Sequence, residues 1–108
     1  MNKDYRGDTF FRNYSIRLDN ELYEFDNGDK IKVAFCQYGK EKQLLKEIEL
    51  VEGKTEVEVA WDAQEMATLS IGEYILEVEF NTKKFVKTEQ EKIKIDEDFI
   101  YGEQQWKQ

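Results

Sequence analysis

A strand, a short helix and a second strand follow one another in residues 57–80, and this order constrains the fold more than any other part of the chain. The second strand, Glu73–Phe80, alternates apolar side chains with mostly acidic ones, as a strand with one buried face does. Asp62 and Glu65 have the spacing of a capping box at the start of a helix. The segment therefore predicts a strand that crosses between two sheets through a short helix at about residues 62–69.

The same two-residue period recurs along most of the chain, and turn residues separate the repeats. It predicts strands at Phe10–Leu18, Leu22–Phe25, Lys30–Gln37, Leu44–Leu50, Glu56–Trp61, Glu73–Phe80, Lys84–Thr88 and Lys92–Ile95. About seven or eight short strands at regular spacing are typical of an all-β antiparallel sandwich, with a small barrel as the alternative. We expect the sandwich to fill residues 1–97, with Gly72 as a left-handed helix stop, and residues 98–108 to form a tail.

The charge of the chain excludes several classes of partner. A chain of 108 residues with a net charge of −8 and no basic cluster is repelled by nucleic acid and by anionic membranes. It contains no histidine, and Cys36 is its single cysteine, so imidazole catalysis, thiolate metal sites and internal disulfides are excluded. No signal segment or membrane span is apparent, and we expect synthesis in the cytoplasm.

Acidic residues are the remaining candidates for chemistry. Glu73, Glu77 and Glu79 share one strand face, but paired carboxylates of a glycosidase need a cleft, and we expect this face to be solvated. The oxygen ligands of residues 26–29 lack the layout of a calcium loop and are typical of a turn. We therefore expect no enzyme activity, no cofactor and no metal.

Aromatic residues offer two interpretations. Trp61 and Tyr74 lie in phase with aliphatic core positions, which favours burial over a sugar-stacking platform. The tail residues Phe99, Tyr101 and Trp106 follow no core pattern, and exposed aromatics of this kind anchor protein partners. We take these three as candidate partner-binding residues.

The chain also resembles a known family. The opening Arg6-Gly7-Asp8-Thr9-Phe10, the segment Trp61-Asp62-Ala63-Gln64-Glu65-Met66-Ala67-Thr68-Leu69 and the following Gly72-Glu73-Tyr74 are similar to the N-terminal domain of phage upper baseplate proteins. The resemblance covers roughly residues 5 to 97. It implies an immunoglobulin-like sandwich with a structural role in the tail tip of a bacteriophage or prophage, and it carries over no catalytic residue.

We therefore expect a structural module that joins a tail baseplate through contacts with baseplate proteins or with copies of itself, and that is located in the virion. The alternative is a carbohydrate-binding sandwich, which would need an exposed coplanar pair among Trp61, Tyr38 and Tyr101. A small carboxylate-based hydrolase is a third hypothesis, and it would need a buried pair of acids in a concave pocket.

Overall fold

The computed structural model describes residues 4–5 and 9–96. Strands dominate these ranges and a single short helix is present in them, so the predicted all-β class is confirmed. The elements are β1 (Asp4–Tyr5), β2 (Phe10–Tyr14), β3 (Arg17–Leu18), β4 (Glu21–Leu22), β5 (Lys30–Cys36), β6 (Gln43–Glu49), β7 (Val57–Trp61), α1 (Ala63–Met66), β8 (Gly72–Asn81) and β9 (Val86–Asp96). Three strands, β1, β3 and β4, have only two residues each, and they raise the number of strands above the predicted seven or eight.

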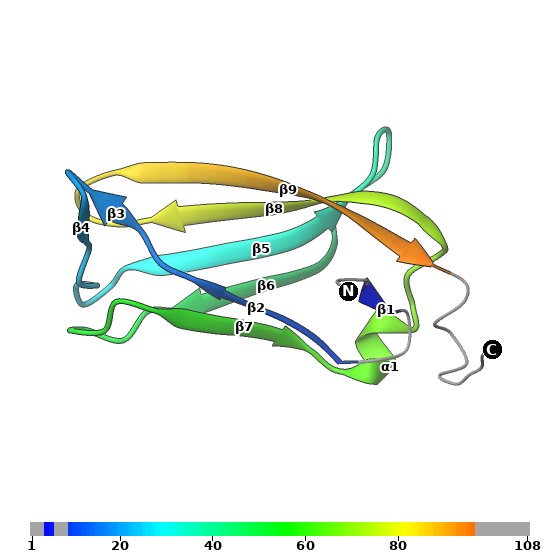
Figure 1. The fold of residues 1–108 in the computed structure, drawn as a ribbon, viewed down its shortest axis with the longest axis horizontal. Helices are drawn as coiled ribbons and strands as arrows, with labels where there is room; N and C mark the ends of the chain where they lie inside the picture. The colour runs from blue at the N-terminus through cyan, green and yellow to red at the C-terminus, as the bar shows by residue number, and fades with distance from the viewer. Residues whose placement is uncertain (1–3, 6–8, 97–108) are drawn as a thin grey trace.

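The strands form two layers (Figure 1). One layer is a five-stranded sheet in the order β1-β9-β8-β5-β6, in which β1 runs parallel to β9 and all other neighbours are antiparallel. The other layer is the antiparallel pair β2-β7. The β3–β4 hairpin lies at one end of the molecule, and α1 lies at the other.

Aromatic rings fill the space between the layers. The ring of Phe35 on β5 lies 5.5 Å from that of Phe10 on β2 and 5.1 Å from that of Trp61 on β7. Tyr14 meets Phe80 edge-on across the same gap, with ring centroids 6.3 Å apart. Full burial of each large apolar side chain contributes about 1.5–3 kcal/mol, so these contacts hold the two sheets together.

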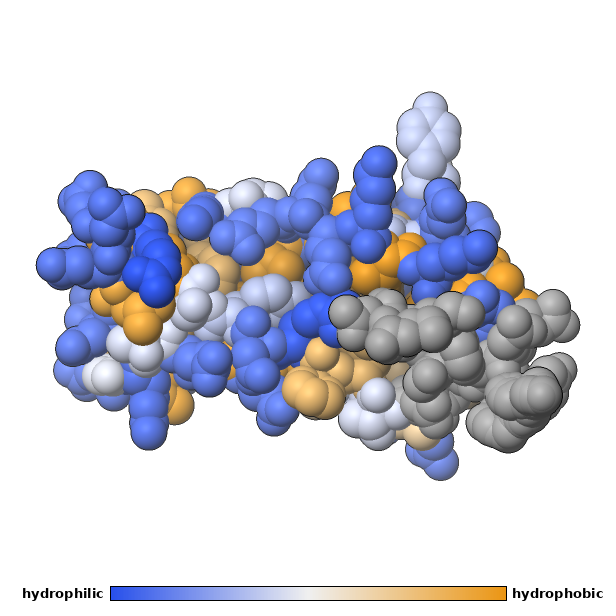
Figure 2. Space-filling view, viewed as in Figure 1, coloured by the Kyte–Doolittle hydropathy of each residue, from blue (hydrophilic) through white to orange (hydrophobic). Residues whose placement is uncertain are grey.

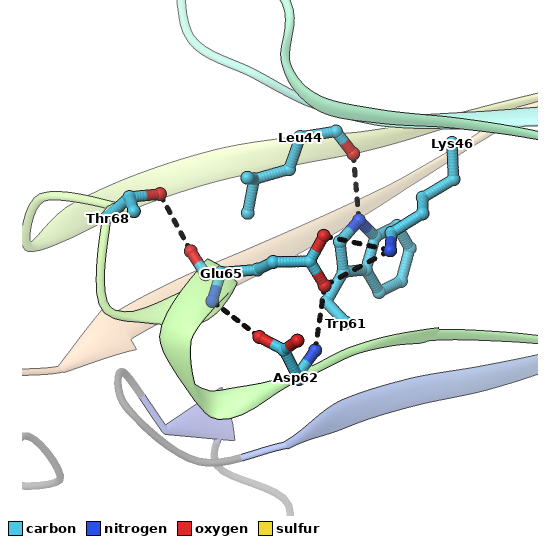
Figure 3. A network of polar contacts seen from close by, with 6 residues as sticks. All are labelled: Leu44, Lys46, Trp61, Asp62, Glu65 and Thr68. Carbon is cyan, nitrogen blue, oxygen red and sulfur yellow. Dashed lines mark hydrogen bonds and ion pairs between the residues drawn. The ribbon is translucent and has the colours of Figure 1, made fainter.

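Helix α1 carries the chain from one layer to the other (Figure 3). The Asp62 side chain accepts the backbone N–H of Glu65 at 2.7 Å, and the Glu65 carboxylate accepts the N–H of Asp62 at 2.9 Å. Glu65 also pairs with Lys46 of β6 at 2.9 Å, while the indole N–H of Trp61 donates to the Leu44 carbonyl at 2.8 Å. The predicted capping box is confirmed, and its glutamate ties the helix to the five-stranded sheet.

The end of the helix differs from the prediction. The helix ends at Met66, and its C-cap Ala67 has the right-handed conformation, so Gly72 is not the helix stop. Gly72, with a φ of 147°, instead opens β8, where the chain turns into the sheet. Just beyond it, the hydroxyl of Tyr74 donates to the carbonyl of Ser70 at 2.7 Å and fixes this corner.

Strand β6 contains a β-bulge that the alternation did not predict. The register with β5 shifts by one residue between Val33 and Phe35, and Leu44 has a φ of 53°. An extra residue in the left-handed conformation bends the strand. This bend presents the Leu44 carbonyl to the indole of Trp61.

The predicted extents of three strands, the first and the last two, were also wrong. The first ends at Tyr14, and the chain then turns into the β3–β4 hairpin, which leaves Leu18 40% exposed instead of buried. The last two form a single strand, β9, paired with β8 throughout. Its inward positions include polar residues because Arg12 of β2 meets Glu91 there in a two-point ion pair, with nitrogen–oxygen distances of 3.1 Å and 2.9 Å.

Candidate interaction surface

The three predicted partner-binding residues, Phe99, Tyr101 and Trp106, lie outside the described residues. The tail boundary at residue 98 lies outside them as well. Their role in binding a partner therefore remains a prediction.

Trp61 and Tyr74 are core residues, as predicted. Trp61 is fully buried, and Tyr74 is 2% exposed with its ring edge-on to Phe35. Since a sugar ring stacks on an exposed aromatic face, Trp61 cannot belong to such a platform. Tyr38, at the tip of the β5–β6 loop, is fully exposed.

The acidic outer face of β8 is neutralised by lysines. Glu77 forms an ion pair with Lys42 at 2.8 Å, and the hydrogen bond from this lysine lowers the pKa of the Glu77 carboxyl. Glu73 and Glu79 lie directly opposite Lys94 and Lys32 on the neighbouring strands. Opposite charges across strands stabilise a solvated sheet face.

Asp29 is buried, and its carboxylate organises two loops. It accepts hydrogen bonds from the Tyr23 hydroxyl at 2.7 Å, the Asp26 N–H at 2.8 Å and the Lys83 N–H at 3.1 Å. Burial alone would raise the pKa of Asp29, but these donors together lower it below its usual value. The predicted turn is thus held by a fully satisfied carboxylate that joins the β4–β5 loop to the β8–β9 turn.

Two kinds of site are absent from the described part of the chain. No cluster of three or more histidine, cysteine or acidic side chains there is arranged to hold a metal ion. No helix within residues 4–5 and 9–96 has the length and apolar character needed to cross a bilayer.

The β5–β6 loop projects from one end of the five-stranded sheet (Figure 1). A hollow of about 360 Å³ lies beside this loop. Its wall is built from cross-strand rows of outward side chains: Cys36, Ile75 and Lys92 form one row, and Glu73 and Lys94 form the next. Burial raises the pKa of the Cys36 thiol, and the carboxylate of nearby Glu77 adds to this effect. Both effects disfavour the thiolate, which is the nucleophilic form of the side chain.

Gln37 lies beside this hollow with one unsatisfied atom. Its amide nitrogen donates to the Glu73 carbonyl at 3.3 Å, but its buried Oε1 has no hydrogen-bond partner among the described residues. Tyr38 follows Gln37 in the same loop, which combines an exposed ring with an unused acceptor. An unpaired buried acceptor costs about 1–3 kcal/mol, so a donor supplied from outside would be favoured here.

The face of the molecule drawn in Figure 2 is mostly hydrophilic. Figure 2 shows charged and polar residues over most of the visible face, with apolar residues in separate small areas. Single exposed apolar residues such as Phe11, Leu45 and Val51 are common in soluble proteins and indicate no site by themselves.

Sequence reasoning missed the hollow, although one signal for it was present. Lys92 and Lys94 occupy alternate positions of one strand and so share a face, but the sequence does not show which residues of other strands they meet.

Comparison of the chain with protein-family models, with curated proteins and with solved structures gives no match.

Proposed function

We propose that this chain is a structural module of a bacteriophage or prophage tail baseplate, acting by protein–protein assembly and located in the virion. Its partners are baseplate proteins or further copies of the chain. The proposal assigns it no catalytic activity, cofactor or metal.

The observation that carries the proposal is the inter-sheet crossover. The segment that gives the resemblance to phage upper baseplate proteins is the one that joins β7 to β8, and its capping box is formed by Asp62 and Glu65. The Tyr74 hydroxyl of the Gly-x-Tyr stretch binds the Ser70 carbonyl. The residues shared with the family thus make the contacts that define this corner, which supports a common architecture.

We further propose that the sandwich is immunoglobulin-like. A tyrosine near the start of a strand that binds the backbone a few residues upstream, after the crossing between sheets, is typical of that fold. Tyr74 has this position and this bond. The central strands β5 and β8, together with β1, which pairs in parallel with only the last two residues of β9 and leaves the rest of β9 as an edge, also support the assignment.

The edge strands favour assembly through loops rather than through strand pairing. Lys46 on β6, Arg12 on β2 and Lys87 on β9 all point toward the interior side of their sheets, and inward-facing charges on edge strands discourage pairing with another chain. The loops and sheet ends are therefore the surfaces left for partners.

The experiment that tests this proposal is mass spectrometry of phage-sized particles purified after prophage induction of the source organism. A structural role predicts this 13.0 kDa chain at a stoichiometric level relative to other tail proteins. Its absence from the particles, while it is present in the cell extract, would overturn the proposal.

Carbohydrate binding is a second candidate because Tyr38 is fully exposed beside a hollow with polar side chains. The burial of Trp61 leaves only Tyr38, among the described residues, from the expected aromatic pair. A glycan array tests this candidate. Binding that is lost in Tyr38→Ala but kept in Phe11→Ala, an exposed aromatic on the other sheet, would support it.

A further inference from the structure

The hollow beside Gln37 has the properties of a binding site for an extended peptide. Ile75 supplies an outward apolar side chain to its wall, whereas Ile93 faces the core, and the ring of Tyr38 lies at its margin. The unpaired Oε1 of Gln37 requires a hydrogen-bond donor, and an extended backbone presents N–H groups at every residue. Two independent features, a hollow and an unused buried acceptor, therefore meet at one place.

The charge of this hollow selects the occupant. Lys92 and Lys94 face it against the single carboxylate of Glu73, so the wall is locally cationic in a chain of net charge −8. Opposite charge on a partner speeds encounter and fixes its orientation. An acidic segment that also carries apolar side chains fits both the lysines and the exposed surface of Ile75 and Tyr38.

Residues 97–108 of this chain have that composition. They include the acidic residues Glu97, Asp98 and Glu103, against one lysine, and the apolar residues Phe99, Ile100, Tyr101 and Trp106. The segment of twelve residues can reach at most about 40 Å when extended. It follows β9, which has already passed Lys92 and Lys94 when it ends at Asp96. A copy's own segment would therefore have to turn back along β9 to reach its own hollow, whereas the segment of a second copy can approach without this reversal.

We propose that the hollow lined by Gln37, Tyr38, Ile75, Lys92 and Lys94 binds residues 97–108 of a second copy of the chain. This inference rests on the proposed assembly function and names one of its contacts. The contact is head-to-tail, because the two surfaces are different, and contacts of this kind build rings or open chains. It also gives the aromatic residues Phe99, Tyr101 and Trp106 a defined partner surface.

The test is a charge exchange in the full chain, with self-association measured by sedimentation equilibrium over a wide range of concentration. The double variant Lys92→Glu/Lys94→Glu is expected to weaken association about tenfold, as loss and reversal of close charge pairs do. Glu97→Lys/Asp98→Lys is expected to weaken it similarly. The combination of all four changes restores opposite charges and is expected to recover most of the lost affinity.

The matched control is Lys83→Glu/Lys84→Glu, which makes the same change of charge at exposed positions of the β8–β9 turn, at the opposite end of the sheet. It is expected to associate like the wild type. Thermal unfolding followed by circular dichroism verifies that each variant is folded, and Gln37→Leu provides a second, uncharged variant that should also weaken association.

Three results would overturn the inference: a wild-type chain that is monomeric at every concentration, hollow variants that behave like the control, or no recovery in the fourfold exchange. These results leave the proposed function intact if the chain is still found in purified particles. Absence from particles together with successful charge exchange would reject the baseplate role and keep the contact.

Discussion

Asp29 shows how one residue can decide the stability of two loops. Its carboxylate is fully buried and takes three donors, which belong to Tyr23, Asp26 and Lys83. The Asp29→Asn substitution keeps the shape of the side chain but replaces one acceptor oxygen with an NH₂ group. This group would then face at least one of the existing N–H or O–H donors and could not accept its hydrogen bond. We expect the free energy of unfolding, measured by urea denaturation, to fall by about 3 kcal/mol.

Asp19→Asn is the control for this change, because Asp19 is exposed and asparagine tolerates its φ of 53°. It should alter the free energy of unfolding by less than about 0.5 kcal/mol. The pKa of Asp29 is lowered in the fold, so its contribution is present above the unfolded pKa of about 4 and is lost as the pH falls through the lower folded value. The difference in the free energy of unfolding between wild type and Asp29→Asn should therefore become smaller below about pH 4. A difference that stays constant with pH would contradict this account.

For Tyr14 and Tyr23 we expect the opposite pH dependence of stability, in the alkaline range. Burial raises the pKa of each from 10.0 to about 12, helped by the Glu91 carboxylate for Tyr14 and by the hydrogen bond to Asp29 for Tyr23. Because the folded pKa exceeds the unfolded one, their stabilisation is complete below about pH 10 and is lost as the pH rises through about 12. Ultraviolet titration of tyrosinate should show late-titrating groups in the native protein, and Tyr14→Phe or Tyr23→Phe should each remove one. Titration of both at their ordinary pKa while the protein is folded would refute the assignment.

At the scale of elements, the crossover depends on a four-residue helix that could not persist alone. Asp62→Ala removes the side-chain acceptor of the capping box, and we expect a loss of about 1 kcal/mol in the free energy of unfolding. Asp62→Ser keeps an acceptor at the N-cap and should restore most of it. Equal stability of the alanine and serine variants in urea denaturation would show that the cap does not limit stability.

The elements also show which parts of the fold were predictable. The alternation of Glu73–Phe80 and the spacing of Asp62 and Glu65 are local signals, and the structure confirms both. The bulge at Leu44 was not predictable, because leucine rarely adopts a positive φ. The contact that accompanies this conformation is the hydrogen bond from the indole of Trp61 to the Leu44 carbonyl, and Trp61 is distant in the sequence.

The continuity of β9 and the hollow were hidden for a similar reason. The polar residues in the middle of β9 suggested a break, but Glu91 meets Arg12, 79 residues earlier in the chain, and the strand continues. The hollow joins Cys36 to Lys92 through Ile75, and sequence alone does not give this register. Local patterns thus predicted the strands, while the pairings that form the candidate site depend on residues far apart in the sequence.

At the scale of the whole molecule, the two-layer fold leaves strand edges that must not associate. Along β9 the inward positions Lys87 and Glu89 form an ion pair at 3.3 Å, although the same face carries apolar residues farther along the strand. Charges at inward positions of an edge strand make pairing with another chain unfavourable, since they would be buried. The inward charges therefore disfavour contacts made through this strand edge.

This argument predicts the effect of removing both charges. In Lys87→Ile/Glu89→Ile, the edge of β9 becomes apolar on its inner side, and we expect new association through strand edges, detected by light scattering coupled to size exclusion. High salt should not dissolve these oligomers, whereas it should weaken a contact made through Lys92 and Lys94. The control Thr88→Ile/Gln90→Ile adds the same apolar groups to the outward face of the same strand, where the inward charges remain, and should cause much less association. Equal association of the two double variants would mean that added hydrophobicity alone, and not the loss of inward charge, drives the effect.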